Sequence, residues 1–121
     1  MAAVVVLVMA SCAKPSEKAA GTYNGNAVVN GSTYSCTTIV TANGDDKANI
    51  QATANSITYS VDGVSLTLNN DVVTFTYTSN TTTSNEVTAV TGTVTNNAIA
   101  ITMTIMISNP FTIDVVITGT K

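Results

Sequence analysis

The sequence predicts an all-β protein, an antiparallel up-and-down barrel of about eight strands that follows a short N-terminal signal. Threonine, valine and isoleucine dominate from Gly21 onward, and these β-branched residues favour strands over helices. Apolar and polar residues alternate through most of this region, as they do in strands with one buried face. Asn and Gly pairs interrupt the alternation at short intervals, where tight turns are expected.

The first half of the domain divides into strands at these turns. Asn30-Gly31 is a hairpin signal after the first strand, and a second strand runs over about residues 32–42 to a polar turn at 43–46. Asp62-Gly63 predicts a further turn, between a fourth and a fifth strand. The residues that share one face are, strand by strand, Tyr23, Gly25, Ala27 and Val29; Ala48, Ile50 and Ala52; Ile57, Tyr59 and Val61; and Val64, Leu66 and Leu68.

The second half contains the longest loop candidate, the polar run of residues 78–86. We interpret it as a free hairpin tip, with a lid or contact loop as the alternative. Strands are expected before it over 73–77 and after it over 87–95, 98–108 and from 111 to Gly119. The last two carry long apolar rows: Ile99, Ile101, Met103, Ile105 and Ile107, and then Phe111, Ile113, Val115 and Ile117.

A β-sandwich is the alternative to the barrel, since both are built from short antiparallel strands. The successive turns are nearly all tight, which suits a meander, whereas a Greek-key sandwich needs long return connections. Closure also removes exposed sheet edges, which matters for strands so rich in β-forming residues. These two arguments favour the barrel.

The N-terminal segment is an apolar run that ends in Ala10-Ser11-Cys12. It resembles a bacterial lipoprotein signal, in which a peptidase cuts before the cysteine and the cysteine thiol carries diacylglycerol. The run is far shorter than the about 20 residues of a membrane-spanning helix. Signal peptides normally have a positive n-region, and no Lys or Arg precedes this run, which leaves open whether Met1 is the true start.

This resemblance implies a signal peptide over residues 1–11, a lipidated Cys12 with a tether over 12–20, and a barrel domain over 21–121. The tether is small, charged and proline-bearing, without strand periodicity. The expected location is the bacterial cell envelope, at the outer membrane, with membrane contact through the lipid on Cys12. Cys36 then has no intrachain partner, and its strand-like setting predicts a small core residue.

A second resemblance concerns the domain itself. Gly21-Thr22-Tyr23 at the first strand, the tight-turned strands and the ending over 115–121 resemble the calycin-like or lipocalin-like domain of small bacterial lipoproteins. In lipocalins an aromatic residue of the first strand plugs the closed barrel end, and a basic residue from the chain end covers it. The resemblance implies that Tyr23 and Lys121 form this barrel-end plug. It also implies a cup that holds a small apolar molecule.

Tyr34, Tyr59 and Tyr77 are the candidate ligand-binding residues at the mouth of such a cup, because tyrosine combines an apolar body with a polar tip. Simple packing is the alternative role for all three. A cavity of about 300 Å³ or more would favour ligand binding. The bulky rows of the last two strands could instead fill the lumen, which would favour display or scaffolding.

Composition disfavours several other functions. The chain has no histidine, so the usual general base and the triads that depend on it are absent. We expect no catalytic residue, no cofactor and no metal site, because the cysteines and carboxylates show no metal-ligand spacing. Nucleic acid is not an expected partner, since the chain has four basic residues, all lysines, and a net charge of −3.

The function expected from these observations is that of a lipid-anchored, noncatalytic envelope protein that binds a small apolar ligand or a protein partner. The first alternative is a β-sandwich interaction or adhesion module with residues 78–86 as its contact region. The second is a carboxylate-dependent carbohydrate enzyme that would draw on the scattered acidic residues Asp62, Asp71, Glu86 and Asp114.

Overall fold

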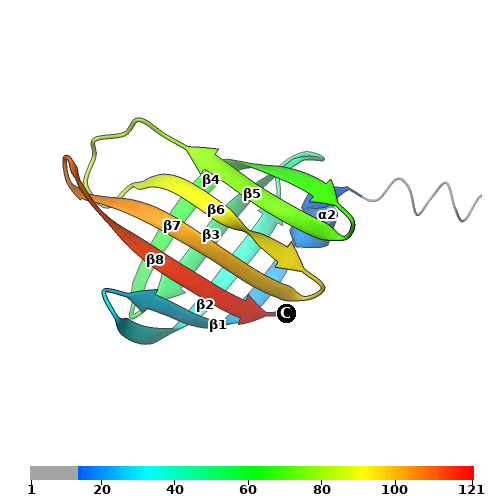
Figure 1. The fold of residues 1–121 in the computed structure, drawn as a ribbon, viewed down its shortest axis with the longest axis horizontal. Helices are drawn as coiled ribbons and strands as arrows, with labels where there is room; N and C mark the ends of the chain where they lie inside the picture. Colours follow the sequence, from blue (N-terminus) through cyan, green and yellow to red (C-terminus); the bar gives the residue numbers. More distant parts are fainter. Residues whose placement is uncertain (1–13) are drawn as a thin grey trace, which may run out of the picture.

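The computed structural model describes residues 14–121, which form a closed antiparallel barrel (Figure 1). Each strand pairs with its neighbours in sequence, and the last strand pairs with the first. The elements are α2 (Pro15–Ala19), β1 (Gly21–Val29), β2 (Ser32–Ala42), β3 (Lys47–Ala54), β4 (Ile57–Asn69), β5 (Val72–Thr78), β6 (Val87–Thr95), β7 (Ala98–Ser108) and β8 (Phe111–Thr120). The predicted up-and-down barrel is confirmed, and the β-sandwich alternative is wrong, because β1 pairs with both β2 and β8. The predicted signal peptide and Cys12 lie outside the described residues.

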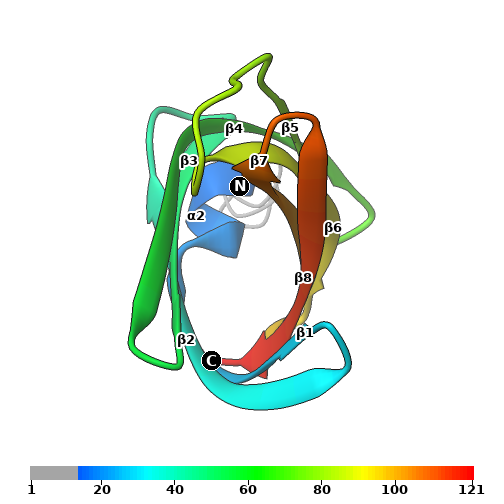
Figure 2. The ribbon, with the colours of Figure 1, turned by 90° about the vertical axis from the view of Figure 1, so that its left-hand side faces the viewer.

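The connections gather at two ends of the barrel. Helix α2, the turns β2–β3, β4–β5 and β6–β7, and the C-terminus lie at one end, which we call the closed end. The other three hairpin turns and the loop of residues 79–86 lie at the opposite, open end. Figure 2 looks into the open end, with α2 visible at the far end of the barrel.

The core occupies the inside of the barrel. Inward-facing residues alternate with outward-facing residues, many of them Thr, Ser and Asn, along most of each strand, as the period of two in a strand requires. The largest side chains that are fully buried include Tyr23, Phe75, Ile50, Ile99, Ile101, Met103, Ile105 and Ile117. Four of these come from β7, so the apolar row predicted there fills much of the lumen on its own side.

The predicted turn at Asp62-Gly63 is wrong, because β4 runs through both residues. Gly63 has a φ of 73°, which lies in the left-handed region, and the register between β3 and β4 shifts beside it. Its N–H donates to Asn49 Oδ1 at 3.1 Å. An Asp-Gly pair can therefore form a β-bulge within a strand as well as a hairpin turn. The bulge merges the predicted fourth and fifth strands into one.

The polar loop of residues 79–86 is bonded to the barrel wall and differs from the free hairpin tip expected. The Asn85 N–H donates to the Met106 carbonyl at 2.7 Å, and the Met106 N–H donates to the Glu86 carbonyl at 2.9 Å. Met106 is 7% exposed, although the alternation along β7 places it on the outward face. The loop therefore covers this part of the outer surface.

Residues 15–20 also differ from the predicted tether, because most of them form α2 and pack into the closed end. Ser16 and Ala19 of this helix are buried. Pro15 suits the first helical turn, while Glu17 and Lys18 have the charges that the two ends of a helix dipole favour. Five residues are too few for a periodic apolar pattern, which explains the difference. Within residues 14–121, no helix has the length and apolar character needed to cross a membrane.

Candidate functional site

The closed end is plugged by Tyr23, Lys121 and α2. The Tyr23 side chain is 1% exposed, and its hydroxyl donates to the carbonyl of Ala19 at 2.7 Å. The Lys121 ammonium lies 5.3 Å from the centroid of the Tyr23 ring, within the range of a cation–π contact. It also donates to the carbonyls of Lys18 at 2.9 Å and Ala20 at 2.8 Å. The structure thus brings together the two residues that the lipocalin resemblance assigns to the plug.

Gly21 makes room for this arrangement. A Cβ atom at this position would lie 2.7 Å from Cδ of Lys121, and the φ of Gly21 is 148°. A side chain here would therefore displace the stem of Lys121 and strain the backbone. The Gly-x-Tyr pattern at the start of β1 lets the last residue of the sequence reach across the barrel end.

Burial shapes the electrostatics of the plug. It raises the pKa of Tyr23 to about 12, because the phenolate would lose its hydration. Burial also lowers the pKa of Lys121, because the charged form of lysine, which burial disfavours, is the protonated one. The Tyr23 phenol is therefore a neutral donor at physiological pH.

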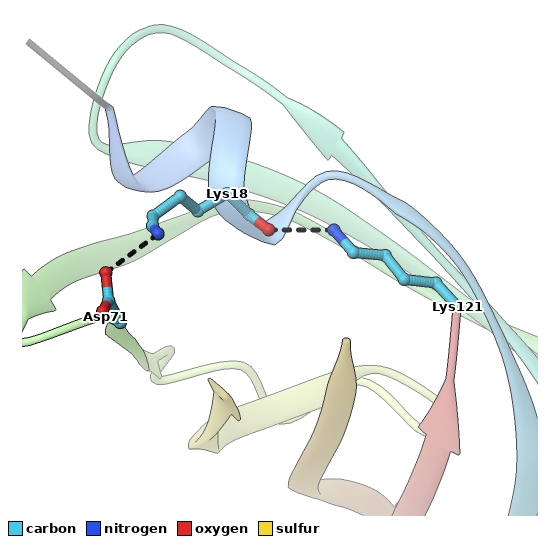
Figure 3. Close-up of polar contacts among 3 residues, drawn as sticks. All are labelled: Lys18, Asp71 and Lys121. Atoms are coloured by element: carbon cyan, nitrogen blue, oxygen red, sulfur yellow. Dashed lines mark hydrogen bonds and ion pairs between the residues drawn. The ribbon is translucent and has the colours of Figure 1, made fainter. Parts of the chain in front are cut away.

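Two ion pairs attach α2 to the turns of the closed end. Lys18 Nζ lies 3.1 Å from Asp71 Oδ1 in the β4–β5 turn, and Lys14 Nζ lies 3.2 Å from Asp45 Oδ1 in the β2–β3 turn. Figure 3 shows Lys18 between two contacts, with its side chain directed to Asp71 and its carbonyl accepting from Lys121. Because both pairs are exposed, each contributes little to stability, and the buried contacts of Tyr23 and Ala19 carry most of the attachment.

The open end leads into an apolar cavity of about 230 Å³, which we call the mouth cavity. Small side chains on β1, β2 and β3 create this space: Ala27, Cys36, Ala52 and Ala54. Ile113, Val115 and Ile117 of β8 form much of its remaining wall. Bulky residues of β5 to β7 fill the rest of the lumen, so the cavity lies to one side of the barrel.

Two of the three tyrosines predicted at the mouth line this cavity. Tyr34 lies opposite Ala27 in the β1–β2 register, and Tyr59 lies opposite Ala52 in the β3–β4 register. Tyr77 belongs to the same end of the barrel but is not part of the lining, and it packs against the core from β5. Among residues 14–121, Tyr23 is the tyrosine whose hydroxyl has a hydrogen-bond partner, so those of Tyr34 and Tyr59 are available to a ligand.

Sequence reasoning missed the residues whose small size opens the mouth cavity. Cys36 is 4% exposed, with Sγ 3.6 Å from Thr38 Oγ1, and its setting is that of a small core residue. The signal was nevertheless present, because the inward positions of β1 to β3 carry Ala and Cys where those of β7 carry Ile and Met. Asn55, in the β3–β4 turn, is a polar lining residue that alternation along strands does not reveal.

The carboxylates that the sequence offered for catalysis do not line the mouth cavity. Asp62, Asp71, Glu86 and Asp114 are all exposed, and Asp114 accepts a hydrogen bond from Thr104 Oγ1 at 2.8 Å on the outer face. Within residues 14–121, no group of three or more His, Cys, Asp or Glu side chains is placed to hold a metal ion.

The size of the mouth cavity limits what it can hold. Its volume lies below the about 300 Å³ at which drug-sized pockets begin and above the about 150 Å³ of an apolar cavity that binds benzene. The lining offers apolar contact over most of its area, with two phenols and one amide as polar groups. It is suited to noncovalent binding of a small molecule or of one end of a longer one.

Comparison with known proteins identifies the fold. No family model and no curated protein matches the sequence. Among solved structures, the chain is similar to the crystal structure of a candidate outer membrane protein from Bacteroides fragilis, with a TM-score of 0.72 and 22% identity. The similarity covers 90% of this chain and 53% of the other, so this chain spans about half the length of that relative. At this level of identity the likeness concerns the fold alone.

Proposed function

We propose that this chain is a lipid-anchored, noncatalytic protein of the bacterial envelope that binds a small apolar ligand in the mouth cavity. The observation that carries this proposal is the difference between the two barrel ends. One end is plugged by Tyr23, Lys121 and α2, while the other opens through an apolar cavity with two unpaired phenols, Tyr34 and Tyr59. A barrel that is closed at one end and hollow at the other has the form of a cup.

The way in which the closed end is plugged supports a lipocalin-like character for the domain. An aromatic residue of the first strand, Tyr23, is covered by a basic residue that follows the last strand, Lys121. The two residues come from opposite ends of the domain sequence and meet only because the barrel closes. Their arrangement matches the plug of the family that the sequence resembles.

Cys12 is the proposed lipidation site, and the position of α2 suggests how the anchored barrel is oriented. The described chain begins at Lys14, at the closed end, two residues after Cys12. A lipid on Cys12 would therefore hold the closed end near the membrane and direct the mouth cavity away from it.

The outer face of the barrel supports a position outside the lipid. Thr, Ser and Asn predominate at outward positions in residues 21–121, whereas a barrel that spans a membrane presents apolar residues outward. The outer membrane is the proposed location, supported by the lipoprotein-like segment and by the description of the B. fragilis relative as a candidate outer membrane protein.

Native mass spectrometry of the protein purified from its own host tests the proposal. We expect a fraction of the protein to carry a small molecule that dissociates on activation. Ala52→Leu should abolish this fraction, because the added carbons would occupy the mouth cavity opposite Tyr59. Ala100→Leu is the matched control, since Ala100 is exposed on the outer face of β7. Repeated recovery without any bound small molecule would refute ligand binding.

A further inference from the structure

The mouth cavity and the basic residues lie at opposite ends of the barrel. The four lysines of the sequence are all at the closed end: Lys14 just before α2, Lys18 in α2, Lys47 at the start of β3 and Lys121 after β8. The residues that line the mouth cavity include no charged side chain. A ligand in this cavity therefore has no cation within reach.

The charged residues toward the open end of the barrel are acidic. Glu86 lies in the loop of residues 79–86 at the open end, and Asp114 lies on the outer face of β8, near its start at Phe111. Neither lines the cavity, but both add negative charge to this end of the barrel, where the described residues include no lysine. An anionic ligand would be repelled at the opening and would find no compensating partner inside.

The polar groups of the lining are instead neutral. Tyr34, Tyr59 and Asn55 carry two phenols and one amide, and all three lie near the open end of their strands or in the adjoining turn. The rest of the lining is largely apolar, with Ala27 and Val115 among its residues. A carboxylate brought into this setting would lose its hydration without an ion pair, whereas a hydroxyl or carbonyl group would exchange water for the phenols and the amide.

We infer that the mouth cavity selects uncharged ligands, with an apolar group of roughly six to nine carbons inside and a neutral hydrogen-bonding head at Tyr34, Tyr59 and Asn55. The range of carbons follows from the volume of about 230 Å³, compared with the about 150 Å³ cavity that holds benzene. This inference rests on the proposed function and adds the chemical class of the ligand. It excludes free fatty acids, whose carboxylate is ionised at neutral pH.

Two probes that differ in the head group alone test the inference: 1-octanol and octanoate. Their affinities are measured by isothermal titration calorimetry at neutral pH, with the full chain carrying Cys12→Ser to prevent lipidation. We expect 1-octanol to bind at least about tenfold more tightly than octanoate, which corresponds to about 1.4 kcal/mol. Equal or tighter binding of octanoate would overturn the inference and leave the proposed function standing. Binding of neither probe would refute the proposed function itself.

A positive charge placed at the rim should reduce or remove the preference for 1-octanol over octanoate. Ile57 lines the mouth cavity and is 50% exposed, so the stem of a lysine can occupy its place while the ammonium stays in water. Ile57→Lys should raise the affinity for octanoate at least about tenfold and change that for 1-octanol little. Thr33→Lys is the matched control, because Thr33 is exposed on the outer face beside Tyr34. An equal gain from both variants would show a general charge effect and overturn the inference.

Discussion

Gly25 of β1 lies directly opposite Gly119 of β8, at the seam where the first and last strands close the barrel. A Cβ atom at Gly25 would collide with the carbonyl oxygen of Thr118, and one at Gly119 would lie 3.1 Å from the backbone of Asn24. The two strands therefore approach each other more closely here than side chains allow. This close approach lies two residues from Tyr23, and it brings the end of β8 to the plug.

Gly25→Ala should weaken the seam. We expect the free energy of unfolding to fall by at least about 2 kcal/mol, because the methyl group must push β1 away from β8. Urea unfolding followed by far-UV circular dichroism measures this change. Asn26→Ala, at the next and exposed position of β1, should change stability by less than about 0.5 kcal/mol. Similar values for the two variants would contradict the close approach.

Tyr23→Phe should separate the hydrogen bond of the plug from its packing. The ring remains, but the Ala19 carbonyl loses its donor, and we expect a loss of about 1 to 3 kcal/mol in the free energy of unfolding. Asp71→Asn removes the exposed ion pair with Lys18 and should cost less than about 1 kcal/mol, with the difference disappearing at high salt. A larger loss for Asp71→Asn would mean that the surface pairs, and not the buried plug, hold α2.

The raised pKa of Tyr23 predicts a pH dependence of stability at alkaline pH. The pKa rises from 10.0 to about 12 on folding, so the folded state retains the phenol proton longer than the unfolded state does. The contribution to stability is complete below pH 10 and is lost as the pH rises toward about 12. The stability difference between wild type and Tyr23→Phe should therefore shrink over this window, as measured by urea unfolding at several pH values.

Lys121, the other titrating group of the plug, also makes the stability depend on pH. The pKa of Lys121 is lowered, so its own contribution runs in the opposite direction and stability gains as the pH rises through its titration. Lys121 is present in both proteins and cancels to first order in their difference. A constant difference between wild type and Tyr23→Phe over the whole window would contradict the raised pKa of Tyr23.

Local sequence signals predicted most of the barrel wall. The bounds expected for β2 and β7 agree with the structure, because Asn30, Gly31 and Asn96 adopt the positive φ that tight turns require. Alternation then identifies the inward face of each strand. At Gly63 the same local reasoning failed, because a positive φ at glycine serves a bulge as well as a turn.

The mouth cavity depends on nonlocal packing that a single strand pattern does not contain. Its volume is set by which inward side chains meet across the lumen, and small residues of β1 to β3 meet a lumen already filled from β7. Phe111 also shows that alternation along a strand does not by itself predict burial. It belongs to the inward row of β8 by alternation, yet it is 70% exposed because it stands at the rim, where no strand lies above it.

Filling the mouth cavity should stabilise the domain while it removes the binding site. Ala52→Leu adds apolar carbons to a space lined by Ala54 and Val115, and we expect the free energy of unfolding to rise by about 0.5 to 2 kcal/mol. Thermal unfolding of ligand-free protein measures the effect, with the exposed Ala100→Leu as the control. A lower melting temperature for Ala52→Leu alone would mean that the cavity has no room for the added group.

Lipidation of Cys12 predicts a specific mass for the protein in its own host. Intact-mass measurement of the membrane fraction should find a chain that begins at Cys12 and carries diacylglycerol. Cys12→Ser should abolish the modification and release the protein from the membrane fraction. Cys36→Ala should leave both unchanged, because Cys36 is buried in the barrel and does not take part in anchoring. A membrane-associated chain that retains Met1 and an unmodified Cys12 would refute the lipid anchor, and the orientation proposed for the mouth cavity would then lose its basis.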